Sequence, residues 1–488
     1  MARSIKKNYL LNLVNSGTQI LFPLISFPYV ARIMMADGIG LVNFYGSIIQ
    51  YIILACGLGI PLYGVREVAR VRSDSAALQQ TTVELLTLST LLSLVGYAVV
   101  GVLCLTVGRI QENIPLFLII SMNLFFTTIG CEWFYQGTED FGYITLRGII
   151  VKTISLVFLF VFVRSKSHLL LYGLYTVLGT LGGNIFNFIR LRKYVHLREI
   201  RWKSLSLQPH LKASLAVFLF TVVSSVYLQL STVLLGFMQN DAEVGYYGAS
   251  MKLVRMIMMV SSAFGVVMLP RLSNLVAEKR MDEFRQLSPK AFEFMVFLTL
   301  PMAIGVVFES PYLIPVMCGP GFEPSIPVLM ITAPIIFAIG LSNVLGMQIF
   351  YPLGKIGLVN LCTGIGAVGS LTINLLLIPR MGAVGSAIAT LAAESAVTLS
   401  MFLIGRDSIP FKLRWNWLSD YVIGAGLMAL VLVIVCRLVH LSDFWMLILV
   451  LVTGVTVYCG YLALRGNGFY LEAKNKLLGY LKRGVIDG

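Results

Sequence analysis

The sequence has few charged residues and few of the side chains that build metal or redox sites. Charged residues make up 12% of the 488 residues, about half the share usual for a soluble domain, which is too little to cover a water-exposed surface. There are four histidines, and the seven cysteines are scattered without a CxxC spacing. A zinc site or a disulfide framework is therefore not expected. Since a Walker A motif for ATP is also missing, no cofactor is predicted.

Long apolar runs make up most of the chain instead. Hydrophobic residues account for 57% of it, and the mean hydropathy is +0.85. Each spanning helix needs about 20 apolar residues, and hydrocarbon offers backbone groups no other partner, so the runs must be helices. We therefore expect an all-α integral membrane protein with about fourteen transmembrane helices and no large extramembrane domain. The predicted ranges are 9–31, 40–60, 82–105, 114–134, 148–163, 168–189, 213–238, 249–270, 291–308, 326–350, 356–378, 383–405, 419–439 and 443–464.

Lysine and arginine gather on one side of these predicted helices. Clusters at 66–72, 190–203 and 271–290 follow the second, sixth and eighth helices, whereas the loops at 239–248 and 309–325 contain acids and neither Lys nor Arg. This asymmetry places the N-terminus and, with an even helix count, the C-terminus in the cytoplasm. Topology thereby explains the net charge of +14, and a nucleic-acid partner is not expected.

Two pairs of similar segments lie six predicted helices apart. Each pair links one helix to the helix six positions later, which predicts two six-helix lobes related by a parallel repeat, with two helices appended. Repeated halves around a central site are a recurring transporter architecture. The paired segments are 44–46 with 246–248 and 129–135 with 345–351. The predicted divisions are an N-terminal lobe at 1–200, a C-terminal lobe at 201–410, and two further helices with a cytoplasmic tail at 411–488.

Polar side chains follow one face of several predicted helices. In the first helix, Asn12, Asn15 and Gln19 are spaced three and four residues apart, which places them on one face. Such amides could form a packing seam with neighbouring helices or line a water-filled cavity. We favour the cavity because the number of amides on this face exceeds what a seam needs. The other amides assigned to the cavity are Asn43, Gln50 and Gln229.

Four charged residues in or next to the predicted membrane segments are candidates for function. Lys252 and Arg255, at i and i+3 of the eighth helix, point the same way. Charges at this depth normally face a bundle interior, although both could reach the outer headgroups. Two cations in a wet cavity would bind an anionic group, with phosphate the natural candidate. Arg32, at the outer end of the first helix, is either an interface anchor or a cation at the cavity mouth. Glu394, midway along the twelfth helix, could pair with a cation or couple transport to H⁺ or Na⁺.

Six short motifs extend from the first predicted helix to the twelfth. They are NSG at 15–17, FYGS at 44–47, GVREVAR at 64–70, EWFYQG at 132–137, LPRLS at 269–273 and GAVGSAIAT at 382–390. In order and spacing they resemble the polysaccharide repeat-unit flippases (Wzx-type) of the multidrug/oligosaccharidyl-lipid/polysaccharide exporter superfamily. The resemblance covers most of the chain.

This resemblance implies a central cavity between two lobes and alternating access in the bacterial inner (cytoplasmic) membrane. The implied substrate is an undecaprenyl-pyrophosphate-linked oligosaccharide, translocated for O-antigen, capsule or exopolysaccharide biosynthesis. Family members carry cations in the cavity, and Lys252 and Arg255 match them by type and helix. The related peptidoglycan-precursor flippases carry more arginine in the first helix, whereas here only Arg32 remains, which suits another sugar. Membrane lipid surrounds such a protein, and a polysaccharide polymerase and chain-length proteins stay open as partners.

Other functions fit the residues less well. A multidrug or cation antiporter of the same superfamily would need cavity acids, and only Glu394 lies deep enough. A membrane glycosyltransferase or polysaccharide polymerase would need sizeable outer loops with catalytic residues, and the outer loops are short. A purely structural membrane partner would not need the polar faces. We therefore expect a transporter and not an enzyme.

Overall fold

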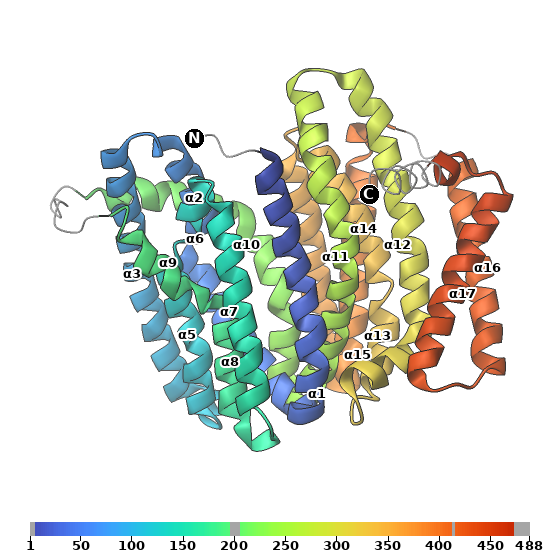
Figure 1. Ribbon diagram of the computed structural model, residues 1–488, viewed down its shortest axis with the longest axis horizontal. Helices are drawn as coiled ribbons and strands as arrows, with labels where there is room; N and C mark the ends of the chain where they lie inside the picture. Colours follow the sequence, from blue (N-terminus) through green and yellow to red (C-terminus); the bar gives the residue numbers. More distant parts are fainter. Residues whose placement is uncertain (1–4, 196–204, 412–414, 473–488) are drawn as a thin grey trace, which may run out of the picture. The chain divides into compact units, whose positions relative to one another are not determined.

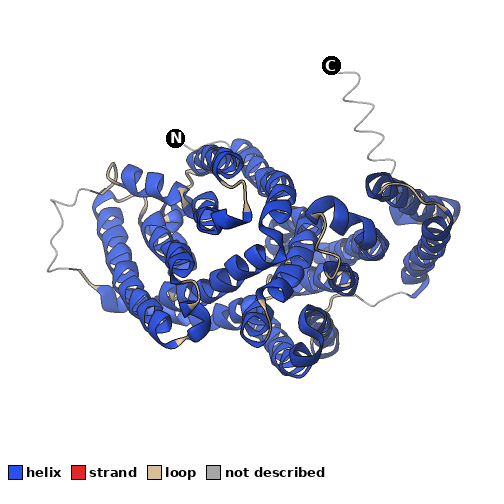
Figure 2. Ribbon diagram, turned by 90° about the horizontal axis from the view of Figure 1, so that it is seen from below, coloured by secondary structure: helices blue, strands red, loops and turns tan. Residues whose placement is uncertain are grey.

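The computed structural model describes residues 5–195, 205–411 and 415–472, and its regular structure there is helical throughout (Figure 2). Side chains of residues 5–16, 19–20, 180–181, 263 and 415–417, and of several positions between 219 and 228, are outside this description. The prediction of an all-helical membrane protein is confirmed: the described chain holds nine helices long and apolar enough to cross a membrane, or eleven if each of two bent pairs is one span.

The chain forms two compact units, Met1–Gly248 and Ala249–Gly488. Within each unit the long helices run side by side (Figures 1 and 2). The first unit contains α1 (Ile5–Gly57), α2 (Ile60–Val71), α3 (Ser75–Thr106), α4 (Gly108–Gln111), α5 (Ile114–Gly130), α6 (Glu132–Gly137), α7 (Phe141–Phe162), η1 (Lys166–His168), α8 (Leu169–Leu181), α9 (Gly183–Leu191), α10 (Leu207–Met238) and the start of α11 (Asp241–Ala277). The second contains the rest of α11, then α12 (Met281–Cys318), α13 (Ser325–Thr332), α14 (Ile335–Asn343), η4 (Val344–Phe350), α15 (Ile356–Ile404), η5 (Arg406–Ser408), α16 (Trp415–Leu438) and α17 (Asp443–Leu464). The predicted lobe boundaries and the internal repeat stay predictions.

Two very long helices each contain a break that separates two predicted spans. The 49 residues of α15 would measure about 74 Å as one straight helix, more than twice the thickness of the hydrocarbon layer. Gly382 interrupts α15 with φ 53°, a left-handed conformation that glycine adopts readily. Met35 does the same in α1 with φ 56°, which is unfavourable for a residue with a Cβ. Each of the fourteen predicted ranges lies on helical segments of the structure, and 114–134, 168–189 and 326–350 each extend over more than one of them.

Small residues let α1 and the start of α11 approach each other closely in the first unit. Gly40 lies against the carbonyl of Asp241, and Gly245 lies against the carbonyl of Ala36, with no room for a Cβ at either glycine. Close backbone approach through small residues is the usual way for helices to pack tightly in a membrane, where lipid removes the hydrophobic driving force between them. This contact positions the first turns of α11.

Candidate functional site

The two predicted cargo-binding cations lie on α11 in different surroundings. Ser250 fixes this part of the helix, because its hydroxyl donates a hydrogen bond to the carbonyl of Ser325 (3.0 Å) at the start of α13. Lys252 is half-buried, and the buried thiol of Cys318 at the end of α12 is within its electrostatic range. Arg255 is exposed and forms no ion pair with any described residue. The structure therefore turns Arg255 outward from its unit and Lys252 partly inward.

Two amide side chains lie against α11 at Gly265. Gly265 leaves room for the side chains of Asn343 and Gln348, which lie 3.7 and 3.4 Å from where its Cβ would be. Gln348 belongs to η4, a single stretch of π-helix, and is 1% exposed. Within the described chain its Oε1 has no hydrogen-bond partner. Single π-turns frequently mark functional sites, so Gln348 joins the candidate residues; the sequence showed it only as part of a repeat segment.

The amide side chains predicted to line the cavity differ in their exposure. Asn43 is half-buried and lies against Gly248, where a Cβ would not fit, while Gln50 on the same helix is exposed. Between them, the buried Ser47 donates a hydrogen bond to the carbonyl of Asn43 (2.8 Å). Gln229 of α10 is half-buried. The side chains of Asn12, Asn15 and Gln19 lie outside the described residues, so the cavity-lining role of all these amides stays a prediction.

Arg32 and Glu394 are both accessible from the surface of their units. Arg32 is exposed, and its Nη1 donates to the carbonyl of Pro28 (2.9 Å) one turn earlier in α1. Glu394 is half-buried in the second half of α15. Its backbone carbonyl and that of Ala338 in α14 each lie 2.9 Å from the Thr398 hydroxyl, which ties α14 to this turn of α15. Its role in ion coupling stays a prediction.

The EWFYQG motif forms α6 and is fixed by hydrogen bonds to α9. The Tyr135 hydroxyl donates to the carbonyl of Asn187 (2.7 Å), and the Asn187 amide donates to the carbonyl of Gly130 (2.6 Å) at the end of α5. The Arg147 guanidinium of α7 forms an ion pair with Glu132 (2.7 Å). Sequence reasoning did not single out Arg147 or Asn187, because their partners come from other helices.

A second polar network joins α2, α3 and α10. His210 lies 2.8 Å from the Glu84 carboxylate through Nε2 and 2.8 Å from the Tyr63 hydroxyl through Nδ1. Glu84 also accepts hydrogen bonds from the Ser206 backbone N–H (2.8 Å) and from Gln80 (3.1 Å). Burial, followed by the Glu67 carboxylate, raises the pKa of Tyr63. The phenol therefore stays protonated and can donate to the imidazole.

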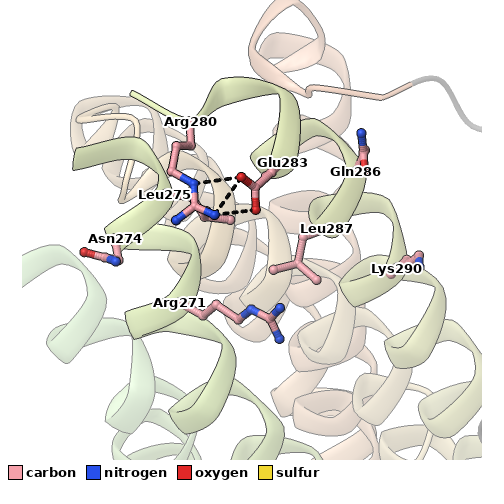
Figure 3. A pocket seen from close by; sticks show the side chains of 8 residues that line it. All are labelled: Arg271, Asn274, Leu275, Arg280, Glu283, Gln286, Leu287 and Lys290. Atoms are coloured by element: carbon pink, nitrogen blue, oxygen red, sulfur yellow. Dashed lines mark hydrogen bonds and ion pairs between the residues drawn. The ribbon is translucent and has the colours of Figure 1, made fainter. Parts of the chain in front are cut away.

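A cationic groove of about 420 Å³ lies where α11 ends and α12 begins. Figure 3 shows Arg271 and Lys290 reaching toward it from the two helices, with Arg280 ion-paired to Glu283 (2.7 Å) above them. The predicted topology places this groove at the cytoplasmic surface, where Lys and Arg are expected. We interpret it as part of the cationic surface that fixes orientation.

Comparison with known sequences identifies relatives along most of the chain. The family model described as polysaccharide biosynthesis protein matches residues 5–276. A protein of Escherichia coli (strain K12) named "Putative O-antigen transporter" is 24% identical over 417 residues, covering 83% of this chain and 97% of that protein. A protein of Haloferax volcanii named as a probable low-salt glycan biosynthesis flippase is 22% identical over 243 residues, covering 49% of this chain and 51% of its own.

Comparison with solved structures identifies the fold. The lipid II flippase MurJ in an inward closed conformation superimposes with a TM-score of 0.73 at 15% identity, covering 93% of this chain and 98% of that one. An inward-facing multidrug resistance MATE family transporter of the MOP superfamily gives a TM-score of 0.59 at 14% identity, covering 82% and 94%. At these identities the likeness shows a shared fold and leaves the cargo open.

Proposed function

The chain belongs to the polysaccharide biosynthesis protein family, and from this premise we propose that it is a flippase for a polyprenyl-pyrophosphate-linked oligosaccharide repeat unit. It moves this cargo by alternating access from the cytoplasmic to the periplasmic leaflet of the bacterial inner membrane, for surface polysaccharide such as O-antigen, capsule or exopolysaccharide. Both chain termini are cytoplasmic. It acts as a transporter and not as an enzyme, in agreement with the names of its relatives, a transporter and a flippase.

The observation that carries this proposal is the pair of cations on α11. A sugar diphosphate linked to a lipid needs positive groups at membrane depth, and Lys252 and Arg255 supply them one turn apart. Arg255 is exposed and has no ion pair with the described residues, so its guanidinium donors are available to phosphate oxygens. Hydroxyl and amide side chains on other helices would hold the sugars.

The positive charge of these residues distinguishes the proposed function from drug antiport. A cationic drug would be repelled by Lys252 and Arg255, whereas a diphosphate would be attracted to them. The structural likeness to both MurJ and the MATE transporter does not decide the matter, because the fold hosts different cargoes. The charge of the α11 face therefore favours an anionic cargo.

The direct test is the leaflet distribution of the lipid-linked oligosaccharide. We expect a strain that lacks the protein to accumulate this lipid in the inner leaflet, protected from a membrane-impermeant glycosidase added outside spheroplasts. Restoring the wild-type chain should expose the sugar to the enzyme. An unchanged distribution in the deletion strain, checked for the absence of a second flippase, would contradict the proposal.

A further inference from the structure

A pocket separate from the predicted cargo site lies between α7 and α9 of the first unit, two helices that contact each other (Figure 1). Its volume is about 370 Å³. It opens where α7 begins and α9 ends, the side that the Lys/Arg pattern predicts to be cytoplasmic. Part of its lining is polar, namely Tyr143, Arg147, Arg190 and Lys193, and the rest is apolar, mainly Leu146, Ile150, Phe186 and Ile189.

The polar part of this pocket contains hydrogen-bond donors without acceptors. The Arg147 side chain is only 9% exposed, and its Nη2 pairs with Glu132. Within the described chain, however, Arg147 Nε and Nη1 and the Tyr143 hydroxyl have no partner. Buried donors without acceptors destabilise a fold, so such groups are rare unless a ligand or water completes them. All three atoms are donors, so the missing group is an acceptor such as a phosphate oxygen.

The surrounding contacts hold these donors in place. Gly183 lets the Arg147 side chain lie across α9, since a Cβ there would be 3.0 Å from Nε. The Arg190 guanidinium stacks on the Tyr143 ring, 3.9 Å from its centroid, and pairs with Asp140 at 2.6 Å. Glu132 and Asp140 thus neutralise two of the three cations at the pocket, which are Arg147, Arg190 and Lys193. One positive charge is left for a ligand. A phosphodiester carries one negative charge.

The apolar part of the pocket points to a lipid as the bearer of that phosphate. Leu146, Phe186 and Ile189 are 61, 48 and 55% exposed on helices that cross the membrane, so they face acyl chains. A pocket with a cationic end and a lipid-facing apolar wall matches the headgroup and the first carbons of a phospholipid. Soluble phosphate would use only the polar end.

We infer that this pocket binds an anionic glycerophospholipid of the membrane through its phosphodiester, with Arg147 and Tyr143 as the principal donors. This site is independent of the transported cargo. The bound lipid would complete the hydrogen bonding of α7 and stabilise its packing against α6 and α9.

The test measures lipid retention by the full chain purified in detergent, using native mass spectrometry with phosphatidylglycerol and phosphatidylcholine. We expect the wild-type protein to retain phosphatidylglycerol preferentially. Arg147→Gln should reduce this retention at least about tenfold, and Tyr143→Phe about threefold to tenfold, because charged hydrogen bonds contribute more than neutral ones. Arg192→Gln, which removes an exposed cation beside the pocket, is the matched control and should leave retention unchanged.

Several results would overturn the inference. One is equal retention of phosphatidylglycerol by the wild type and Tyr143→Phe, a variant that loses only an unpartnered hydroxyl and keeps the ring beneath Arg190. Others are equal retention of phosphatidylcholine, displacement of the lipid by inorganic phosphate at the same concentration, or a Tyr143-dependent preference for a polyprenyl diphosphate. A thermal scan of each variant separates loss of the site from loss of the fold.

Discussion

In the described part of the first unit, most ion pairs join segments that are distant in sequence, whereas most ion pairs in the described part of the second unit join near neighbours in sequence. Arg109 with Asp241 and Arg190 with Asp140 bridge distant segments at 2.7 and 2.6 Å. The hydrogen bond between Glu84 and His210 (2.8 Å) does the same. In the second unit, Arg280 pairs with Glu278 and Glu283 within a few residues. A pair that bridges helices fixes their relative position, so it has a structural role.

Arg255 belongs neither to a pair between distant segments nor to a pair between sequence neighbours of the described chain. It lies well inside α11, is exposed, and has no ion pair with the described residues. An arginine at membrane depth is unfavourable by about 3 kcal/mol or more, so retaining it without an ion pair among the described residues suits a charged ligand. Charges with partners thus organise the fold, whereas Arg255, which has no ion pair among the described residues, can bind a charged cargo.

The largest expected effect comes from removing the unpartnered cation. Arg255→Ala should abolish complementation of a flippase-null strain while the protein level and thermal stability stay at wild-type values, because the charge has no ion pair with the described residues to lose. Arg255→Lys should retain partial activity, and Ser262→Ala, exposed on the same face, should retain full activity. Wild-type complementation by Arg255→Ala would show that transport does not need this charge, and the distinction between structural and cargo-binding charges would not hold.

The next effect concerns a partnered charge and should appear in stability. Glu84→Ala removes the acceptor for Ser206, Gln80 and His210, which should lower the free energy of unfolding by about 3 kcal/mol. His210→Ala should destabilise less, and the double variant should fall short of the sum because the residues share one network. Denaturant titration in detergent measures this.

The exposed carboxylate of Glu112 is the control for the buried carboxylate of Glu84. Glu112 is 58% exposed and pairs with Arg109 at 2.8 Å, so Glu112→Ala should change the free energy of unfolding by less than about 1 kcal/mol. If Glu112→Ala and Glu84→Ala destabilise equally, burial of the network does not explain its contribution.

A smaller and more specific effect is expected at Glu394. If its carboxylate couples cargo movement to H⁺ or Na⁺, Glu394→Gln should leave residual transport that no longer depends on the ion gradient. Cargo exposure in vesicles with and without an imposed gradient tests this. Glu394→Asp, which keeps the charge, should preserve the dependence, and an unchanged dependence in Glu394→Gln would remove the residue from the coupling mechanism.

Helices and family could be predicted from the sequence because apolar length and motif order are local properties. Every predicted range lies on one or more helical segments, and the family is confirmed. In the structure, neighbouring ranges follow each other without a loop in α1 and α15, and only the single-residue breaks at Met35 and Gly382 separate them. A backbone conformation confined to one residue leaves little trace in hydropathy, so these continuous helices were not foreseen.

The candidate site could be predicted only in part, because its chemistry depends on contacts between helices. Lys252 and Arg255 stand out in sequence because charge is rare in an apolar run. Arg147 does not, since it is an ordinary cation at a helix end until Gly183, Glu132 and Tyr143 enclose it. The sequence does contain one signal for this pocket. Tyr143 and Arg147 are four residues apart near the start of α7, and Gly182 and Gly183 mark the break between α8 and α9.

The smallest effect is expected for an exposed ion pair outside the membrane segments. Hydrogen bonds from Arg280, and then from Asn274, hold the pKa of Glu278 below its usual value. A lowered carboxyl pKa stabilises the fold above the usual pKa of about 4.5 and loses this contribution as the pH falls through the folded value. Because Glu278 is fully exposed, water and salt screen the pair. Glu278→Gln should therefore melt within error of the wild type at neutral pH, and any small difference should disappear below a pH of about 4. A clear loss of stability at neutral pH would show that an exposed pair between sequence neighbours can be as structural as Glu84 with His210, and the contrast between the two units would not hold.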